Sequence, residues 1–258
     1  MRQGDLAMRA KRIQVAYFSP TGGTERAARM LAELFGLPVE MHDRTLPEGR
    51  KQVITCEPGD VCIIACPVYA GGIPDVPGLF ENIQGDGTPC VLLATYGNRH
   101  YDNALAKLKE RMGTVGFLTI GAMAAVIPHV FSDQLGAGRP NDEDRSHMAD
   151  FAMEILQKVN NWDVECPVIP GDASAPAKRM AYLPKTLDRE RCTGCGTCAR
   201  ECPAGAIDAK TQTIDEVKCI NCLRCVKKGC GAWSCDYSAI TARLEAHYSA
   251  PRLLEVFL

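Results

Sequence analysis

The chain has 258 residues, a formal net charge of −2, and ordinary shares of hydrophobic (46%) and charged (23%) residues, so one or two domains with a sizeable core are expected. Nucleic-acid binding is disfavoured, because the chain has no basic excess to neutralise phosphates. No apolar stretch reaches the ~20 residues of a membrane-spanning helix, and the N-terminal MRQGDLAMRAKR lacks the apolar core of a secretory signal.

Residues 1–165 alternate short apolar runs with amphipathic segments. The runs expected to form strands are residues 13–19, 38–42 (the weakest), 61–66, 90–95 and 117–126. Nearly continuous apolar character is typical of parallel strands that are covered on both faces. Helices are expected from about residue 24 to Gly36, from Asp102 to Gly113, and from about 141 to 160. Strand and helix in alternation predict an open, doubly wound parallel sheet of the α/β class.

Three segments follow this predicted sheet domain. Residues 166–187 are rich in proline and small residues and are interpreted as a linker or a wrapping segment. Residues 188–241, the cysteine block, hold nine of the 14 cysteines. The tail, residues 242–258, is expected to contain a helix, and its apolar end is expected to dock on a domain. A dense cysteine block behind an ordinary α/β sequence indicates metal ligands in a reducing cytoplasm rather than disulfides.

The cysteine block opens with Cys192-x2-Cys195-x2-Cys198-x3-Cys202-Pro203, the spacing of bacterial 4Fe–4S ferredoxins. An approximate repeat begins 27 residues later. In two-cluster ferredoxins the fourth thiolate of each cluster comes from the other half. By this rule Cys202 completes the cluster held by the three cysteines of the repeat, Cys219, Cys222 and Cys225.

The other cluster then takes Cys192, Cys195, Cys198 and a cysteine that follows Cys225. The second half departs from the pattern here, because four residues separate Cys225 from Cys230, and Gly231 stands in place of the usual proline. Cys230 is favoured, since one inserted residue is a small change and Gly229 is flexible. Cys235 remains the competing candidate.

Structural zinc is the alternative interpretation of this block, because repeated C-x2-C also suits tetrahedral zinc. Zinc sites use pairs of cysteines, whereas this block has two triplets and a Cys-Pro, so two 4Fe–4S clusters are favoured. Residues 188–236 resemble a bacterial two-cluster ferredoxin domain of the small α+β type, which implies the same cofactors.

The first predicted strand ends in Ser19-Pro20-Thr21-Gly22-Gly23-Thr24 and leads directly into a helix. Free amides at a helix N-terminus, hydroxyl groups and glycines are suited to an anion. The loop has neither the Lys-Ser/Thr ending of a triphosphate site nor a G-x-G-x-x-G dinucleotide motif. A terminal monophosphate bound mostly by neutral donors is therefore favoured over these ligands, and from the loop alone a solvated strand–helix turn is an equal alternative.

Ser19, Thr21, Gly22 and Thr24 match the phosphate loop of the flavodoxin family, which this part of the chain resembles. The resemblance implies a five-stranded sheet in the order 2-1-3-4-5 and a bound FMN in residues 1–165. Ligands of open α/β sheets lie beyond the carboxyl ends of the strands, where two further loops are expected. The candidate flavin contacts in all three loops, with Tyr69 or Tyr96 stacking on the ring, are Ser19, Thr21, Gly22, Gly23, Thr24, Pro67, Val68, Tyr69, Gly71, Gly72, Thr95, Tyr96, Gly97, Asn98 and Arg99.

A flavodoxin-like domain followed by a two-cluster ferredoxin domain resembles fused flavodoxin–ferredoxin proteins. The resemblance implies a cytoplasmic electron-transfer protein that passes single electrons between two 4Fe–4S clusters and FMN, with redox proteins as donor and acceptor. A flavin-dependent reductase of a small molecule is the first alternative, and an iron–sulfur redox sensor is the second. No catalytic residue is assigned, and whether the protein is an enzyme is left open.

Overall fold

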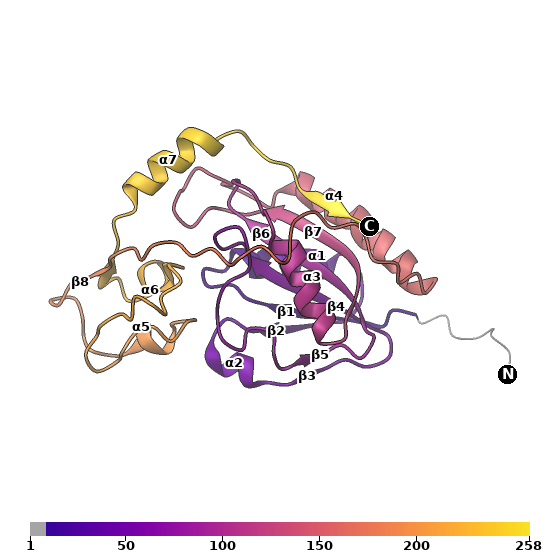
Figure 1. The fold of residues 1–258 in the computed structure, drawn as a ribbon, viewed down its shortest axis with the longest axis horizontal. Coiled ribbons are helices and arrows are strands. Elements are labelled where there is room, and N and C mark those ends of the chain that lie inside the picture. Colours follow the sequence, from indigo (N-terminus) through magenta and orange to yellow (C-terminus); the bar gives the residue numbers. More distant parts are fainter. Residues whose placement is uncertain (1–8) are drawn as a thin grey trace.

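The computed structural model describes residues 9–258, and it places a mainly parallel sheet beside the cysteine block (Figure 1). The sheet has six strands. Their order across the sheet is β10 (Glu255–Phe257), β7 (Leu118–Val126), β6 (Pro89–Tyr96), β4 (Asp60–Pro67), β1 (Arg12–Tyr17) and β2 (Val39–Asp43). The predicted α/β class and the five parallel strands in the order 2-1-3-4-5 are confirmed, with bounds shifted by one or two residues.

The sheet differs from the prediction by its sixth strand, β10, which pairs antiparallel with β7. Val256 lies opposite Met123 in this pairing. The apolar end of the chain was expected to dock on a domain, and it does so by extending the sheet. Three residues are too short a run to carry a strand signal in the sequence.

Helices cover both faces of the sheet. Helix α1 (Gly23–Glu33) and helix α4 (Asp142–Asn160) pack on one face, and α3 (Ala104–Thr114) packs on the other. The four central strands β1, β4, β6 and β7 contribute to both cores because side chains alternate along them: Val15 faces α1 and α4, whereas Ala16 faces the α3 side. These strands are therefore buried almost throughout, which explains their continuous apolar runs, whereas the edge strand β2 is mostly exposed.

The predicted helices are present with small shifts at their ends. Helix α4 is capped as its sequence suggests, since the Asn141 side chain accepts a hydrogen bond from the Asp144 amide at 3.0 Å and Asp144 accepts one from the Asn141 amide at 2.8 Å. Within residues 9–165, three short elements were not predicted: α2 (Pro47–Lys51), β3 (Ile54–Thr55) and β5 (Ile83–Gln84).

The segment between the sheet and the cysteine block follows the surface of α3. Lys107 of α3 donates hydrogen bonds to the carbonyls of Ala173 and Ala175, at 2.9 and 2.5 Å. The Asp172 amide donates to the side chain of Asn103 at 2.9 Å. These contacts describe a wrapping segment that is fastened to the sheet domain over several residues.

The cysteine block is small and has little regular structure. Its elements are β8 (Thr186–Leu187), α5 (Thr197–Arg200), α6 (Arg224–Lys227) and β9 (Trp233–Ser234). Strands β8 and β9 pair antiparallel, so the two ends of the block lie side by side. Helix α7 (Ser238–Tyr248) then leads the chain back toward the sheet (Figure 1).

Residues 248–258, here called the C-terminal arm, are held at the carboxyl edge of the sheet. The Asn98 side chain donates to the carbonyls of Tyr248 and Ala250, at 2.6 and 2.9 Å, and accepts from the Arg252 amide at 3.0 Å. Tyr101 donates to Glu255 at 2.7 Å. The cysteine block is thus connected to the sheet domain at both of its ends.

Candidate functional site

Four cysteines from both halves of the cysteine block line one small cavity: Cys202, Cys219, Cys222 and Cys225. This is the crossed set that the spacing predicts, and it is called the inner cluster site below. Burial raises the pKa of Cys222 to about 12 and that of Cys225 to about 11, and the neighbouring thiols contribute to both shifts. The remaining lining is largely apolar, with Ile207, Ile214 and Leu223 among its members.

The geometry of the inner cluster site suits a cluster. Among residues 9–258, no three Cys, His or carboxylate side chains converge as the ligands of a single metal ion do. In a 4Fe–4S cluster the thiolates bind different irons, so the ligands surround a cavity rather than meet at one point. The Ala206 amide also donates to the Cys202 sulfur at 3.3 Å, the kind of contact that tunes a cluster.

The two cysteine loops share one backbone conformation. Gly194 and Gly196 have positive φ angles of 69° and 68°, and the corresponding residues of the repeat, Asn221 and Leu223, have φ angles of 54° and 55°. Leucine is strained in this left-handed region. Leu223 is fully buried, so its packing offsets that strain and keeps the loop in the shape that glycine gives the first half.

Cys192, Cys195 and Cys198 lie in the first loop, where Cys195 is exposed and the other two are partly buried like the inner set. Hydrogen bonds from Thr197 lower the pKa of Cys195 to about 7, so its thiolate forms near neutral pH. With Cys230 as fourth member, this set is called the outer cluster site below.

Cys230 and Cys235 both follow the segment that pairs with the start of the cysteine block. The Asp188 amide donates to the Ala232 carbonyl at 2.8 Å, and a Cβ on Gly231 would lie 3.4 Å from Arg191. Ser234, next to Cys235, pairs with Thr186. The neighbours that shift the pKa of Cys235 are Lys185, Asp236 and Cys219, after burial as the main cause. The assignment of Cys230 as the fourth outer ligand stays a prediction.

The anion loop begins α1 in the predicted way. Gly22 has a φ of 93° and precedes the first turn, and a Cβ on Gly23 would lie 2.8 Å from Ile127. Both positions therefore require glycine. The backbone amides from Thr21 to Thr24 have no hydrogen-bond partner within residues 9–258. Four free amides at a helix N-terminus are suited to a phosphate group.

Two hydroxyl groups of this loop have structural partners. Ser19 Oγ accepts from the Glu25 amide at 3.0 Å, and Thr24 Oγ1 lies 2.7 Å from Thr95 Oγ1 at the end of the neighbouring strand β6. Thr24 is buried, so it fastens the loop to the sheet. Thr21 retains a hydroxyl group that is partly accessible.

The second predicted flavin loop, which contains Tyr69, forms a tight turn. Tyr69 and Gly72 exchange backbone hydrogen bonds of 2.9 and 2.8 Å around Ala70 and Gly71, both with positive φ angles. Tyr69 is half-buried at the surface of the core. Burial raises its pKa, and the thiols Cys222, Cys66 and Cys219 act in the same direction.

The third predicted flavin loop, residues 95–99, is partly occupied by protein contacts. Tyr96 is buried, with its ring 5.8 Å from that of Tyr101, so Tyr69 alone of the two tyrosines is available for stacking. Asn98 holds the C-terminal arm with its side chain, and Arg99 is paired with Asp102. A ligand at this loop would therefore contact its backbone rather than these side chains.

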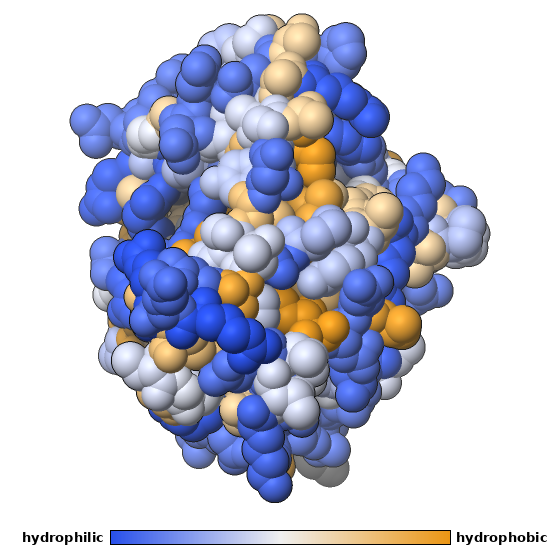
Figure 2. All heavy atoms as spheres, turned by 90° about the vertical axis from the view of Figure 1, so that its left-hand side faces the viewer, coloured by the Kyte–Doolittle hydropathy of each residue, from blue (hydrophilic) through white to orange (hydrophobic). Residues whose placement is uncertain are grey.

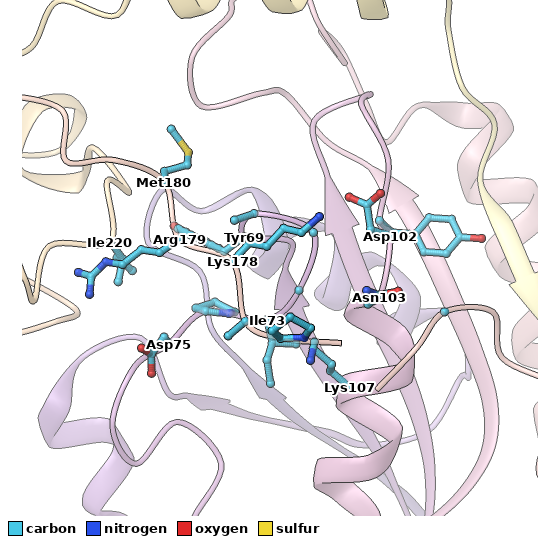
Figure 3. Close-up of a pocket in the computed structure, with 18 of the residues that line it drawn as sticks. Tyr69, Ile73, Asp75, Asp102, Asn103, Lys107, Lys178, Arg179, Met180 and Ile220 are labelled. Atoms are coloured by element: carbon cyan, nitrogen blue, oxygen red, sulfur yellow. The ribbon is translucent and has the colours of Figure 1, made fainter. Parts of the chain in front are cut away.

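A cavity of about 1010 Å³ lies beside the second flavin loop and the end of the third, and its lining does not include the anion loop. Its lining comes from the Tyr69 loop, from Arg99–Asn103, from the wrapping segment and from Cys219–Asn221 of the inner cluster site (Figure 3). Ile220, next to Cys219, packs on the same hydrophobic core as Tyr69. The side of the molecule that carries the cysteine block shows apolar surface framed by hydrophilic side chains (Figure 2).

Several contacts between the two parts of the molecule had no signal in the sequence. Arg224 donates to the Pro20 carbonyl of the anion loop at 2.7 Å, and Arg50 donates to the Pro203 carbonyl at 2.7 Å. Lys228 lies beside Gly22. Isolated arginines and lysines carry no periodicity, so only the docked structure identifies them.

Comparison with known proteins gives one family match, to a 4Fe-4S binding domain, over residues 185–208. A relative from Methanocaldococcus jannaschii, named "Uncharacterized protein MJ0749", is 34% identical over 77 residues. That match spans 30% of this chain and 29% of the relative, so it covers less than a third of either protein.

Among solved structures, a flavodoxin from the domain Archaea is 14% identical with a TM-score of 0.40, and covers 57% of this chain and 98% of its own. A flavodoxin from Streptococcus pneumoniae TIGR4 is 18% identical with a TM-score of 0.40, and covers 57% and 99%. A WrbA-like flavodoxin from Agrobacterium tumefaciens is 15% identical with a TM-score of 0.41, and covers 59% and 99%. The fold assignment here depends on the strand order rather than on these low scores.

The chain therefore combines a sheet of flavodoxin-like strand order with a 4Fe–4S binding domain, a combination that supports a redox role in electron transfer. Among residues 9–258, none of the helices has both the length and the apolar character that crossing a membrane requires.

Proposed function

We propose that this chain is an electron-transfer protein that passes single electrons between two 4Fe–4S clusters and a bound FMN. The observation that supports this most directly is the shared cavity between Tyr69 of the second flavin loop and Cys219 of the inner cluster site. Burial and two inner-site thiols raise the pKa of Tyr69, which is a second sign of this proximity.

In this proposal Cys202, Cys219, Cys222 and Cys225 hold one cluster, and Cys192, Cys195, Cys198 and Cys230 hold the other. Clusters of this type supply one-electron chemistry at potentials that hydrogen bonds, charge and exposure adjust. Arg200 of α5 ties the outer loop together by donating to the Cys195 carbonyl at 2.8 Å and to the Thr197 hydroxyl at 2.9 Å.

FMN is the cofactor proposed for the carboxyl edge of the sheet, where it would supply both one-electron and two-electron chemistry. The free amides from Thr21 to Thr24 would bind its phosphate. The Tyr69 turn and the backbone of residues 95–99 would enclose the ring. The buried contact of Thr24 with Thr95 keeps the first and third loops in register for this.

The two cluster sites differ in the solvent exposure of their cysteines, and this difference supports an order for them in the electron-transfer pathway. Cys195 and Cys230 of the outer site are exposed, whereas all four cysteines of the inner site are partly buried. The outer site is thus the proposed point of exchange with redox partner proteins, and the inner site lies between it and the flavin.

Anaerobic purification, followed by assays of iron, sulfide, zinc and flavin per chain and a visible spectrum, tests the cofactor content. About eight iron, eight sulfide and one FMN per chain are expected. Zinc in place of iron, together with no flavin bound even after addition of FMN, would overturn the proposal.

A flavin-dependent reductase of a small molecule is the second candidate, and the cavity of about 1010 Å³ beside the flavin loops favours it. Its volume is at the upper end of ordinary ligand pockets. Reoxidation of the reduced flavin by a small molecule, with no second protein present, would support the reductase. Reoxidation that always requires a redox protein would support the carrier.

A further inference from the structure

We infer that Lys228 of the cysteine block completes the phosphate site in the sheet domain, so that one flavin phosphate is bound by both parts of the molecule. The inference rests on the proposed flavin function. It adds one charged donor to the mostly neutral donors that the sequence predicts.

Lys228 lies directly over the anion loop. A Cβ on Gly22 would be 3.2 Å from Lys228 Nζ, with no other atom within 4 Å besides the neighbouring Cε. Gly22 is the residue whose positive φ opens the loop, and the free amides of the loop surround it. The ammonium group is therefore on the same loop as the donors proposed for the phosphate.

Among the described residues, no carboxylate pairs with Lys228. Within residues 9–258, Lys228 has no carboxylate oxygen within 4.0 Å, whereas Lys51, Lys218 and Arg224 are paired. Lys228 is exposed, and its ammonium group lies beside the free amides and the helix N-terminus with no internal counter-ion. A phosphate monoester is the ligand that such a site favours.

Arg224 fixes the position of Lys228. It lies one helical turn earlier, at the start of α6, and its guanidinium donates to the Pro20 carbonyl at 2.7 Å while pairing with Glu201. The Arg224 side chain is only 16% exposed, and its Nε is buried with no partner within the described residues. This arginine is a positioning residue that fastens α6 to the anion loop.

The same short helix carries Cys225 of the inner cluster site. Arg224 therefore directly precedes a proposed cluster ligand, and Lys228 follows that ligand by three residues. Binding of the phosphate would hold α6, and with it the inner site, against the flavin loops. Riboflavin, which has the same ring but no phosphate, would lack this effect.

The test is a flavin titration of the cluster-loaded protein from which the flavin has been removed, with FMN and with riboflavin as separate probes. Lys228→Gln is expected to weaken FMN binding by about tenfold or more, the usual size for loss of one charge-assisted hydrogen bond, and to leave riboflavin binding unchanged. Lys228→Arg is expected to restore most of the FMN affinity. Added salt should weaken FMN binding to the wild type more than to Lys228→Gln.

Lys227→Gln is the matched control, because it removes the same charge from the adjacent residue. Lys227 faces the Tyr237 ring at 5.8 Å rather than the loop, so FMN affinity should not change. Equal FMN binding by wild type and Lys228→Gln would overturn the inference and leave the flavin function intact. Equal losses of FMN and riboflavin would overturn it as well, as a general structural effect. A wild type that binds neither flavin would overturn both the inference and the proposed function.

Discussion

The guanidinium group of Arg50 donates a hydrogen bond to the carbonyl of Pro203, 2.7 Å away, across the junction between the sheet domain and the cysteine block. Pro203 follows Cys202 directly. Arg50 is 7% exposed, and its Nη1 is buried without a partner within the described residues. Burial lowers the pKa of Arg50, and the thiolate of Cys202 opposes this shift. A desolvated cation thus lies beside the inner cluster site.

Replacing Arg50 by methionine is expected to lower the reduction potential of the inner cluster. Reduction adds a negative charge, which a nearby buried cation stabilises, so its removal should shift the midpoint by roughly tens of millivolts. Potentiometric titration followed by electron paramagnetic resonance measures this shift. Lys51→Met is the control, since Lys51 is the next residue but is exposed and paired with Glu48. An unchanged midpoint in a fully loaded Arg50→Met protein would contradict the prediction.

The choice between Cys230 and Cys235 is open to a direct comparison of single alanine variants. Cys230→Ala is expected to lose the outer cluster, so that iron falls from about eight to about four per chain. Cys235→Ala is expected to retain both clusters, because Cys235 adjoins Lys185 and Asp236 rather than the first loop. Iron and sulfide assays after anaerobic purification give the answer. Loss of iron from Cys235→Ala alone would reverse the assignment.

Asn98→Ala is expected to loosen the C-terminal arm. The Asn98 side chain is 5% exposed and makes three hydrogen bonds to the arm, so the variant leaves buried polar groups unpaired. We expect the free energy of unfolding to fall by about 1–3 kcal/mol, measured by urea denaturation. Asn160→Ala, at an exposed residue of α4, should stay close to the wild type. Comparable stability for both variants would show that the arm is held mainly by β10.

His129 should make the protein less stable in mild acid. Burial lowers its pKa to about 4, and the cations Lys227 and Arg99 contribute to the shift. Its Nδ1 accepts a hydrogen bond from the Phe131 amide at 3.0 Å, which requires that nitrogen to be unprotonated. Between the unfolded value of about 6.5 and the folded value, the unfolded chain binds more protons, so stability is lost as the pH falls through this window.

The variant His129→Gln tests this dependence, because glutamine keeps an acceptor but does not titrate. Urea midpoints of wild type and variant at pH 7, 6 and 5 are compared. The wild type should lose more stability toward pH 5, while the carboxylates, common to both proteins, contribute equally. Parallel pH profiles would rule out His129 as the source.

The sheet was predictable from the sequence because its central strands are buried on both faces. Runs such as 61–66 and 90–95 are then almost wholly apolar, and their order follows from the flavodoxin-like strand pattern. The grouping of Cys202 with the three cysteines of the repeat could also be predicted, since the crossed ligand rule depends on spacing alone; that these four hold a cluster stays a prediction. Apolar runs and cysteine spacing are properties of short stretches of sequence, so both can be recognised without the structure.

The remaining features depend on contacts between distant parts of the chain. Nothing in the sequence near Arg50, Arg224 or Lys228 signals that they meet the other part of the molecule. Tyr96 was an equal candidate with Tyr69 for stacking, and only its burial removes it. Leu223 occupies a backbone conformation that the sequence rule reserves for glycine, because a buried apolar contact outweighs the strain there.

The antiparallel strand β10 also determines the order in which the protein can be completed. It follows the cysteine block in the chain, yet it belongs to the sheet whose other five strands precede the block. During synthesis the sheet therefore keeps an open edge at β7 until the cysteine segment has emerged. A chain that ends before β10 would present β7 as an unpaired strand, the kind of edge that invites aggregation.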